Sequence, residues 1–159
     1  MHGHGLSIGS ETDDGVKNLT VINCIFNGTT NGVRLKSLTG AGEIMQNLRY
    51  TGVTMKNVLT PFFIDLNCNG SAHYPTDIPS VDRVFIDHLT VTGARNAGKL
   101  MGLSNSTLQH ISLTNMNVSA QTGLVQTNVA NITMSNYVIN VTGDASIIAI
   151  NAIGMVFQL

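Results

Sequence analysis

The chain has 159 residues, of which only 11% are charged, and its formal net charge is −1. This length suits a single domain, but the charged fraction is far below the about 25% of a typical globular domain. The charge balance excludes the basic surfaces that bind nucleic acids or membranes, and no segment approaches the roughly 20 apolar residues of a membrane helix.

Five segments along the chain repeat one pattern: a polar residue, then alternating apolar and polar positions, then a second short apolar run. Their first residues are 29, 36, 27 and 21 positions apart. The segments are NLTVINCIF from Asn18, NLRYTGVTM from Asn47, RVFIDHLTV from Arg83, HISLTNMNV from His110 and NITMSNYVI from Asn131. A second series lies between and after them and consists of GVRLKS, PFFIDLN, KLMGLS, GLVQTNV and SIIAINA.

Both series have the period of two that is typical of strands with one buried face. They are rich in Val, Ile and Thr, while Gly and Asn stand at the breaks, where positive φ is readily adopted. Helical spacing with capping residues is nowhere sustained, and no hairpin turn joins runs of matched length. Each turn of the chain should therefore form one rung. We predict an all-β, parallel β-helix solenoid, a single domain over residues 1–159 with about five to six rungs.

The chain contains seven Asn-x-Ser/Thr triplets. They could be glycosylation sites of a secreted chain, but NLT and NIT recur with the period of the repeat, at the corner of a rung. Asn side chains stacked at such corners can hydrogen-bond to the backbone and to each other, and we expect this role for them. The seven are Asn18, Asn27, Asn69, Asn105, Asn117, Asn131 and Asn140.

The two cysteines give little information about the compartment. Cys24 lies in an apolar alternating strand, where a buried free thiol is expected. A disulfide between Cys24 and Cys68 stays open as the alternative.

Several segments closely resemble glycoside hydrolase family 28, the polygalacturonases and related pectin hydrolases. The resemblance rests on GHGLSIGS, GVKNLTVINCIF, NGVRLKS and NLRYTGVTMKNVLTPFFIDLN; it is strong over residues 3 to about 67 and elsewhere limited to generic β-helix rungs. It implies a right-handed parallel β-helix that hydrolyses α-1,4-linked galacturonate with inversion at the anomeric carbon. It also implies an acidic polysaccharide partner, pectin or oligogalacturonate, and no cofactor.

Inverting glycosidases need two carboxyl groups roughly 6.5–9.5 Å apart, one as acid and one as base. In the family these are aspartates of an Asn-Thr-Asp motif and an Asp-Asp pair, both upstream of Gly-His-Gly. In this sequence Gly-His-Gly is residues 3–5, and only Met1 and His2 precede it. We therefore expect a β-helix that is truncated at its N-terminal end, lacks both aspartates and is inactive alone. Asp13 and Asp14 are expected in a solvated loop, and Asp65, which matches a family aspartate, is expected to be structural.

His4 matches the histidine of the family's Gly-His-Gly, which lies beside the catalytic acid and helps to set its protonation by hydrogen bonding and charge. His2 has no counterpart in the family. A His-x-His metal site is the alternative, but the sequence offers no third ligand nearby. The resemblance therefore implies a supporting catalytic role for His4, and we predict no metal site.

Arg34 and Lys36 match the family's Arg-x-Lys. Val33 and Leu35 alternate with them, so both cations should project from the same side of one strand. Adjacent cations repel each other unless an anion lies between them, and a galacturonate carboxylate, held bidentately by Arg and as a point charge by Lys, would be that anion. The resemblance implies substrate binding by these two residues, and a solvated charged face is the alternative.

Further candidates lie one rung later and in the longest loop. One rung after Arg-x-Lys the family often carries an aromatic residue, which either Phe62 or Phe63 could supply. Residues 67–80 form the longest interruption of the repeat, and His73 and Tyr74 near its tip could line a sugar groove. The acidic calcium cluster of a pectate lyase, which shares the fold, is not found in this sequence.

Three functions stay open: a fragment of a pectin hydrolase, a non-catalytic β-helix that binds acidic polysaccharide, and a purely structural β-helix. Open rungs at the two ends are expected to favour self-association by parallel pairing. Met1 is followed directly by His-Gly-His-Gly and not by a basic and then an apolar run, so no signal peptide is predicted within these residues. The full-length parent is expected to be secreted or periplasmic.

Overall fold

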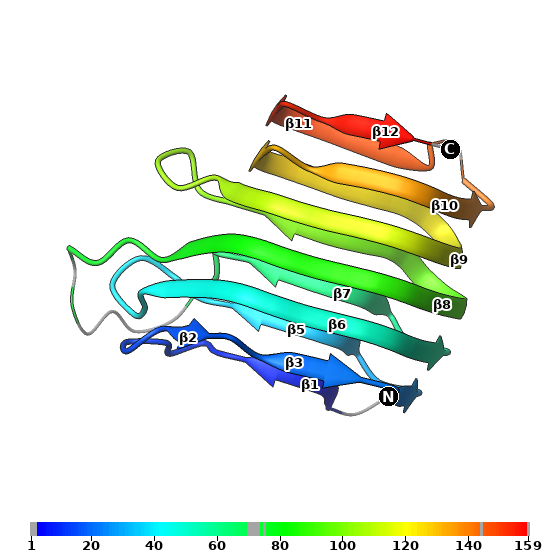
Figure 1. Cartoon of the computed structure of the whole chain (residues 1–159), viewed down its shortest axis with the longest axis horizontal. Coiled ribbons are helices and arrows are strands. Elements are labelled where there is room, and N and C mark those ends of the chain that lie inside the picture. The colour runs from blue at the N-terminus through cyan, green and yellow to red at the C-terminus, as the bar shows by residue number, and fades with distance from the viewer. Residues whose placement is uncertain (1–2, 70–73, 75, 144, 159) are drawn as a thin grey trace.

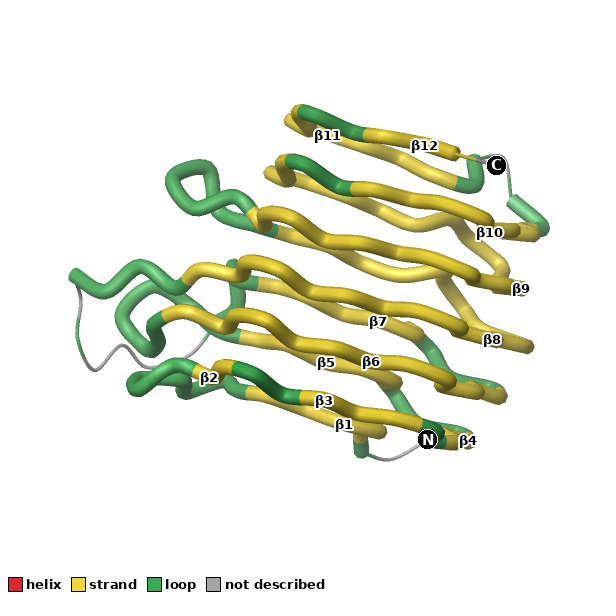
Figure 2. Tube along the Cα trace, viewed as in Figure 1, coloured by secondary structure: helices red, strands yellow, loops and turns green. Residues whose placement is uncertain are grey.

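The computed structural model of the protein describes residues 3–69, 74, 76–143 and 145–158. Every regular element within these residues is a β-strand (Figure 2). Every strand pair in the sheet is parallel. The strands are β1 (His4–Ile8), β2 (Val16–Lys17), β3 (Thr20–Ile22), β4 (Ile25–Asn27), β5 (Asn31–Lys36), β6 (Ile44–Lys56), β7 (Thr60–Asp65), β8 (Ser80–Met101), β9 (Leu108–Ala130), β10 (Thr133–Val141), β11 (Ile147–Ile153) and β12 (Val156–Gln158).

The strands form two faces of one solenoid, stacked in chain order from β1 to β12 (Figure 1). On the first face lie β1, β5, β7, residues 96–101 of β8, residues 122–130 of β9, and β11. On the second face lie β2 to β4, β6, residues 80–92 of β8, residues 109–120 of β9, β10 and β12. The two repeated series of the sequence are therefore the two faces, and the predicted parallel β-helix is confirmed.

The core lies between the faces and consists of in-register rows of inward side chains. Leu35, Ile64 and Leu100 are paired neighbours on β5, β7 and β8, and each is 0% exposed. Tyr50 and Phe62 are the aromatic members of this otherwise aliphatic and Met-containing core among the described residues. Each such burial contributes roughly 1.5–3 kcal/mol, so the stacking of like side chains on successive rungs stabilises the solenoid.

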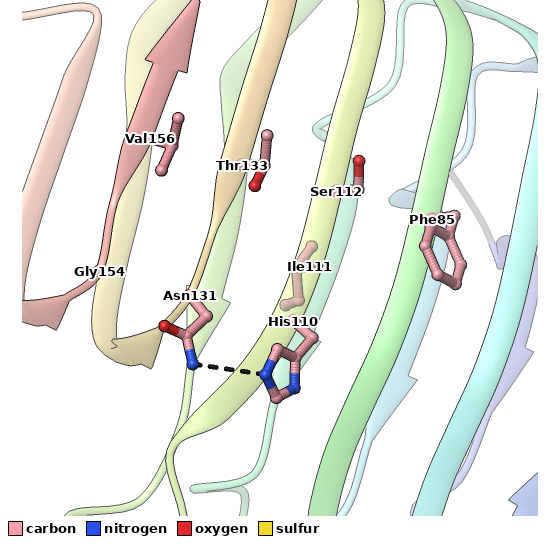
Figure 3. A pocket seen from close by; sticks show the side chains of 8 residues that line it. All are labelled: Phe85, His110, Ile111, Ser112, Asn131, Thr133, Gly154 and Val156. Atoms are coloured by element: carbon pink, nitrogen blue, oxygen red, sulfur yellow. Dashed lines mark hydrogen bonds between the residues drawn. The ribbon is translucent and has the colours of Figure 1, made fainter.

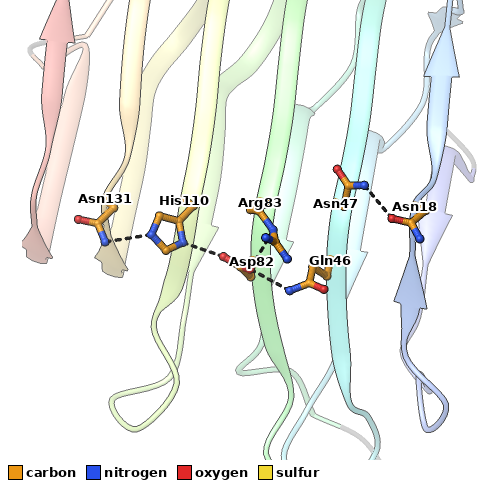
Figure 4. Close-up of polar contacts among 7 residues, drawn as sticks. All are labelled: Asn18, Gln46, Asn47, Asp82, Arg83, His110 and Asn131. Atoms are coloured by element: carbon orange, nitrogen blue, oxygen red, sulfur yellow. Dashed lines mark hydrogen bonds and ion pairs between the residues drawn. The ribbon is translucent and has the colours of Figure 1, made fainter.

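The first residue of each repeat of the first series is a corner of the second face. Asn18, Asn47, Arg83, His110 and Asn131 all have left-handed backbone conformations, with φ between 50° and 60°. Asn is among the few residues that adopt this region easily. Asn47 Nδ2 donates a hydrogen bond to Asn18 Oδ1 over 2.7 Å, so the corners are also joined by side chains (Figure 4).

Two further corner columns are joined in the same way. Asn136 Nδ2 donates to Asn115 Oδ1, and Asn151 Nδ2 donates to Asn128 Oδ1, each over 2.6 Å. The expectation for the Asn-x-Ser/Thr triplets is confirmed for Asn18 and Asn131, which are corner residues. It is wrong for Asn117 and Asn140, which lie within β9 and β10, because the triplet pattern does not distinguish a corner from the middle of a strand.

Both cysteines are free thiols, so the open alternative of a disulfide is not realised. Cys24 is half-buried and not fully buried as expected, with its Sγ 3.6 Å from the carbonyl oxygen of Ile22. The described residues include no helix of the length and apolarity needed to span a membrane.

Candidate functional site

The alternation of β5 places two cations on the outside of the first face. Val33 and Leu35 are 1% and 0% exposed and point into the core, so Arg34 and Lys36 point outward, as predicted. Parallel pairing puts Arg34 beside Ser7 of β1 on one side and Phe63 of β7 on the other. The outward positions of successive strands therefore form continuous rows along the solenoid axis.

Arg34 is held in place by a neighbour that the sequence did not single out. Its Nη1 donates a hydrogen bond to Ser7 Oγ over 2.7 Å. Ser7 lies within GHGLSIGS, but its role depends on the pairing of β1 with β5, which brings residues 27 positions apart together. One guanidinium nitrogen is thus engaged, and the remaining donors stay available to an anion on this face.

The next strand resolves the choice between the two phenylalanines. Phe62 is 1% exposed and belongs to the core, whereas Phe63 is partly exposed in the outward row that contains Arg34. Lys99 Nζ lies 5.1 Å from the centre of the Phe63 ring, in cation–π contact. Lys99 was not predicted as a site residue, although KLMGLS belongs to the second repeated series and could have been aligned with the outward positions of GVRLKS.

Asp65 is structural, as expected. It is only 4% exposed, and Lys99 Nζ donates to its Oδ2 over 2.7 Å. The backbone N–H of Asn67 donates to its Oδ1 over 2.9 Å. A buried carboxylate with both oxygens engaged is a poor proton donor to a substrate.

The charged side chains of the first face converge near the thiol of Cys68. Burial and, second, the charge of Asp65 raise the pKa of this thiol to about 11, although the charges of Lys36, Arg34 and Lys99 act to lower it. Lys36 pairs with Asp65 across β5 and β7, and Lys99 Nζ contacts Asp65 Oδ2, so two of the cations lie beside this carboxylate. Cations outnumber carboxylates in this cluster, and it therefore favours an anionic ligand.

His4 lies one strand before Arg34, at the edge of the same face. Asn31 Nδ2 donates to His4 Nδ1 over 3.1 Å, which leaves the proton of the neutral imidazole on Nε2. The pKa of His4 is lowered, first by desolvation and second by the positive charge of Arg34. His4 is therefore neutral at pH 7, with an Nε2–H that can donate a hydrogen bond.

The remaining acidic and loop candidates lie in turns or outside the described residues. Asp13 and Asp14 lie in the turn between β1 and β2, where the N–H of Gly15 donates to the carbonyl of Thr12, so the predicted loop is confirmed. Tyr74 is 56% exposed, and its N–H donates to the carbonyl of Gly40.

His2 and His73 lie outside the described residues. Within the described ranges no group of three His, Cys, Asp or Glu side chains could hold a metal ion.

The second face carries a polar network at its corner column (Figure 4). Asp82 accepts hydrogen bonds from His110 Nδ1 over 2.7 Å and from Gln46 Nε2 over 2.9 Å, and Arg83 Nε lies 3.3 Å from it. Burial alone would raise the pKa of Asp82, but these hydrogen bonds and the charge of Arg83 outweigh burial and lower it. Asp82 therefore remains ionised and does not suit the role of a general acid.

A pocket of about 310 Å³ lies beside this network (Figure 3). His110 and Asn131 form its polar edge, with Asn131 Nδ2 donating to His110 Nε2 over 3.4 Å, and Phe85 forms an apolar edge. The guanidinium of Arg49 stacks on Phe85 at 4.2 Å, so its charge is already engaged. Arg83, the other cation of this network, is ion-paired with Asp82.

A parallel β-helix with a cationic outer face is the architecture that the structure defines. The family model for glycosyl hydrolases family 28 matches residues 1–143. The chain belongs to this family. The predicted family resemblance is confirmed.

Named relatives agree with this assignment. An endo-polygalacturonase of Pectobacterium carotovorum subsp. carotovorum is 54% identical over 63 residues, covering 40% of this chain and 15% of that protein. An exopolygalacturonase of Arabidopsis thaliana is 32% identical over 127 residues, covering 73% of this chain and 28% of that protein. Polygalacturonase QRT2 of Arabidopsis thaliana is 31% identical over 152 residues, covering 91% of this chain and 34% of that protein. The chain thus spans at most about a third of these relatives, and no solved structure matches it at a significant level.

Proposed function

We propose that this chain forms the substrate-binding part of a polygalacturonase-type hydrolase and that its first face binds the galacturonate chain of pectin. The observation that carries the proposal is the outward pair Arg34 and Lys36 on β5, with the cationic cluster around it. Guanidinium and ammonium groups bind a uronate carboxylate by charge-assisted hydrogen bonds. Relatives named polygalacturonase support this choice of substrate.

We assign His4 a supporting role in the same reaction. Its neutral imidazole can donate from Nε2 to a substrate oxygen or to a carboxyl group beside it, and so favour one protonation state of that group. The hydrolysis itself needs an acid and a base on opposite sides of the glycosidic bond, with a water activated by the base.

We further propose that the 159 residues alone bind the substrate without hydrolysing it. Asp65 is ion-paired and buried, and Asp13 and Asp14 lie in a turn beyond the end of β1. Asp82 belongs to the second face, where its pKa is lowered. Asp87 also lies on the second face and has a lowered pKa. None of these five carboxyl groups suits the role of acid or base in an inverting pair.

The test compares binding and reducing-sugar release from polygalacturonate by the purified chain, by Arg34→Ala and by Lys56→Ala. Lys56 is an exposed cation at the end of β6, and Lys56→Ala is the matched control. We expect all three to release no sugar, and only Arg34→Ala to lose binding by tenfold or more, since a charge-assisted hydrogen bond is worth about 1.5–3 kcal/mol. Sugar release by the chain would overturn the assignment of its carboxyl groups.

A non-catalytic module that binds acidic polysaccharide is the second candidate, and the engaged carboxylates favour it. The two candidates differ in whether catalytic aspartates are encoded before Gly-His-Gly in the complete gene. If Asn-Thr-Asp and Asp-Asp motifs are encoded there and the longer protein hydrolyses polygalacturonate, the first candidate holds. If the longer protein binds but does not hydrolyse, the second holds.

We also propose that the chain self-associates and that its full-length parent acts outside the cytoplasm, where pectin is found. Apolar side chains are exposed at both ends of the stack, with Ile25 at 75% and Ile153 at 70%. Such exposed strand edges pair readily with other strands. Sedimentation velocity over a concentration series tests the association, and a monomer at all concentrations would refute it.

A further inference from the structure

The proposed function leaves the pocket of the second face without a role (Figure 3). This pocket lies along one outward row, in which Phe85 of β8, Ser112 of β9, Thr133 of β10 and Val156 of β12 are neighbours in register. Two short hydroxyl side chains thus lie between two larger apolar ones, and the row is hollowed over its middle. The volume of about 310 Å³ is at the lower end of the roughly 300–1,000 Å³ of ligand sites.

One end of the pocket is an aromatic ring that is supported from behind. Arg49 of β6 is the other neighbour of Phe85 in the row, and its guanidinium lies 4.2 Å from the ring centre. Arg49 therefore covers the ring on the side of β6, while the side of the ring toward β9 lines the pocket. The face of an aromatic ring carries partial negative charge and attracts polarised C–H groups. It is the kind of surface on which the C–H face of a sugar ring packs.

The corner side chains form a polar wall whose hydrogen bonds are fixed (Figure 4). The ionised Asp82 accepts from His110 Nδ1 over 2.7 Å, so the Nε2 of the neutral imidazole is an acceptor, and Asn131 Nδ2 donates to it. Asn131 Oδ1 then faces Gly154, where a Cβ would lie only 2.5 Å from it. Glycine at this corner therefore keeps the amide oxygen uncovered as an acceptor, and the hydroxyl groups of the floor are both donors and acceptors.

The charges around the pocket are already paired or stacked. Its lining, as far as the structure describes it, contains no carboxylate, lysine or arginine. Beside it, Arg83 is ion-paired with Asp82 and Arg49 is stacked on Phe85. A uronate bound here would lie near the ionised carboxylate of Asp82, which disfavours it. The pocket therefore suits a ligand that is rich in hydroxyl groups and carries no charge.

We propose that this pocket is a separate carbohydrate site that binds a neutral hexose. The C–H face of the sugar ring packs on Phe85, and its hydroxyl groups bond to Ser112, Thr133 and Asn131. The core of the solenoid lies between this site and Arg34, so one molecule can hold an acidic chain on its first face and a neutral sugar on its second. The inference does not depend on galacturonate binding at the first face.

The test uses NMR spectra of the purified chain titrated with methyl glycosides of galactose, glucose and mannose at millimolar concentrations. Methyl galacturonide is the charged match of methyl galactoside, since the two differ only in a carboxylate at C6. We expect at least one neutral glycoside to shift the side-chain amide of Asn131 and the imidazole of His110. Methyl galacturonide should bind there at least tenfold more weakly than methyl galactoside.

Three variants assign the binding to the pocket. Phe85→Leu removes the ring, and we expect about tenfold weaker binding of the neutral glycoside. Ser112→Ala and Thr133→Val each remove a hydroxyl group with little change of shape and should weaken it by about three- to tenfold. Thr90→Val is the control, because Thr90 is an exposed outward residue of β8 that does not line the pocket. Binding by Thr90→Val and by Arg34→Ala should equal that of the parent chain.

The spectra of the parent chain test the site even if a variant fails to fold. If no neutral glycoside shifts Asn131 or His110, or if the three folded variants bind it as the parent chain does, the site is refuted. Tighter binding of methyl galacturonide than of methyl galactoside at these residues would refute the neutral class of ligand. None of these outcomes affects the proposed function, which is tested with polygalacturonate and Arg34→Ala.

Discussion

At the scale of single residues, His4 is kept neutral by its surroundings. Desolvation and the charge of Arg34 both disfavour the imidazolium, and Asn31 occupies Nδ1 with a donated hydrogen bond. A neutral imidazole keeps its Nε2–H as a hydrogen-bond donor and its Nδ1 as an acceptor at pH 7 and above. The resemblance implied a supporting catalytic role for this histidine, but only its neighbours in the structure define its protonation state.

We expect the pKa of His4, measured by NMR titration, to lie below 6.5. In Arg34→Ala it should rise part of the way back, because the charge is removed while the larger effect, desolvation, remains. Lys56→Ala should leave it unchanged. A His4 pKa above 6.5 in the parent chain would contradict the assigned environment.

Asp82 leads to a prediction about acid stability. Its folded-state pKa is below the ordinary value of 3.8, so its stabilising contribution is present above pH 3.8 and is lost as the pH falls through the lowered pKa. We expect Asp82→Asn to reduce the free energy of unfolding at pH 7 by about 1 kcal/mol. Urea unfolding of both proteins over a pH series should show the difference shrinking in acid. Asp14→Asn, in the turn, serves as the control, and a pH-independent difference would contradict the linkage.

At the scale of elements, the corner columns let long strands bend without breaking the parallel ladder. A residue with positive φ turns the backbone, and the amide of Asn joins that corner to the rung before it, as Asn47 does with Asn18. Where Gly replaces Asn, as at Gly154, a Cβ would lie 2.5 Å from Asn131 Oδ1. The same column also contains Arg83 and His110, so its corners accommodate several side chains, whereas at Gly154 both conformation and space favour Gly.

Two substitutions at one corner separate these effects. Asn47→Gly removes the hydrogen bond to Asn18 but permits φ 55°, and we expect a loss of about 1 kcal/mol in the free energy of unfolding. Asn47→Ala removes the same bond and adds the strain of a left-handed residue, so its loss should be larger by about 1–2 kcal/mol. Chemical denaturation measures both, and equal losses would show that the left-handed conformation is not the source of the corner preference.

At the scale of the whole molecule, the solenoid is stabilised by contacts between successive rungs. β8 pairs with β6, β7 and β9, whereas β12 pairs only with β10 and β1 only with β5. In such repeat architectures stability is a sum over neighbouring interfaces, so rungs with one neighbour open more readily. The first face extends over several rungs, and its geometry depends on the central ones.

Hydrogen–deuterium exchange should therefore be graded along the stack. We expect the amides of β7 and β8 to exchange slowest and those of β1 and β12 to exchange fastest, by at least tenfold, because a terminal rung lacks the interface on one side. Mass spectrometry of peptic peptides measures the gradient. Uniform protection from β1 to β12 would indicate that the chain opens only as a whole.

The sequence by itself determined the local features of this protein. Its period of two predicts strands, the spacing of the repeats predicts a stack of rungs, and the inward Val33 and Leu35 predict outward Arg34 and Lys36. These features depend on neighbouring residues of one strand, whose side chains alternate by geometry. The family resemblance and the role of Asp65 also followed from short segments.

Only the tertiary structure decided which rows those strands form. The hydrogen bond of Arg34 to Ser7, the ion pair of Lys99 with Asp65 and the hydrogen bond of Asn96 to Thr60 all join residues from different rungs. Their meeting depends on the register of parallel pairing. Turns of unequal length separate the rungs, so equal spacing in the sequence cannot predict that register. Backbone hydrogen bonds between strands and the packing of inward side chains select it.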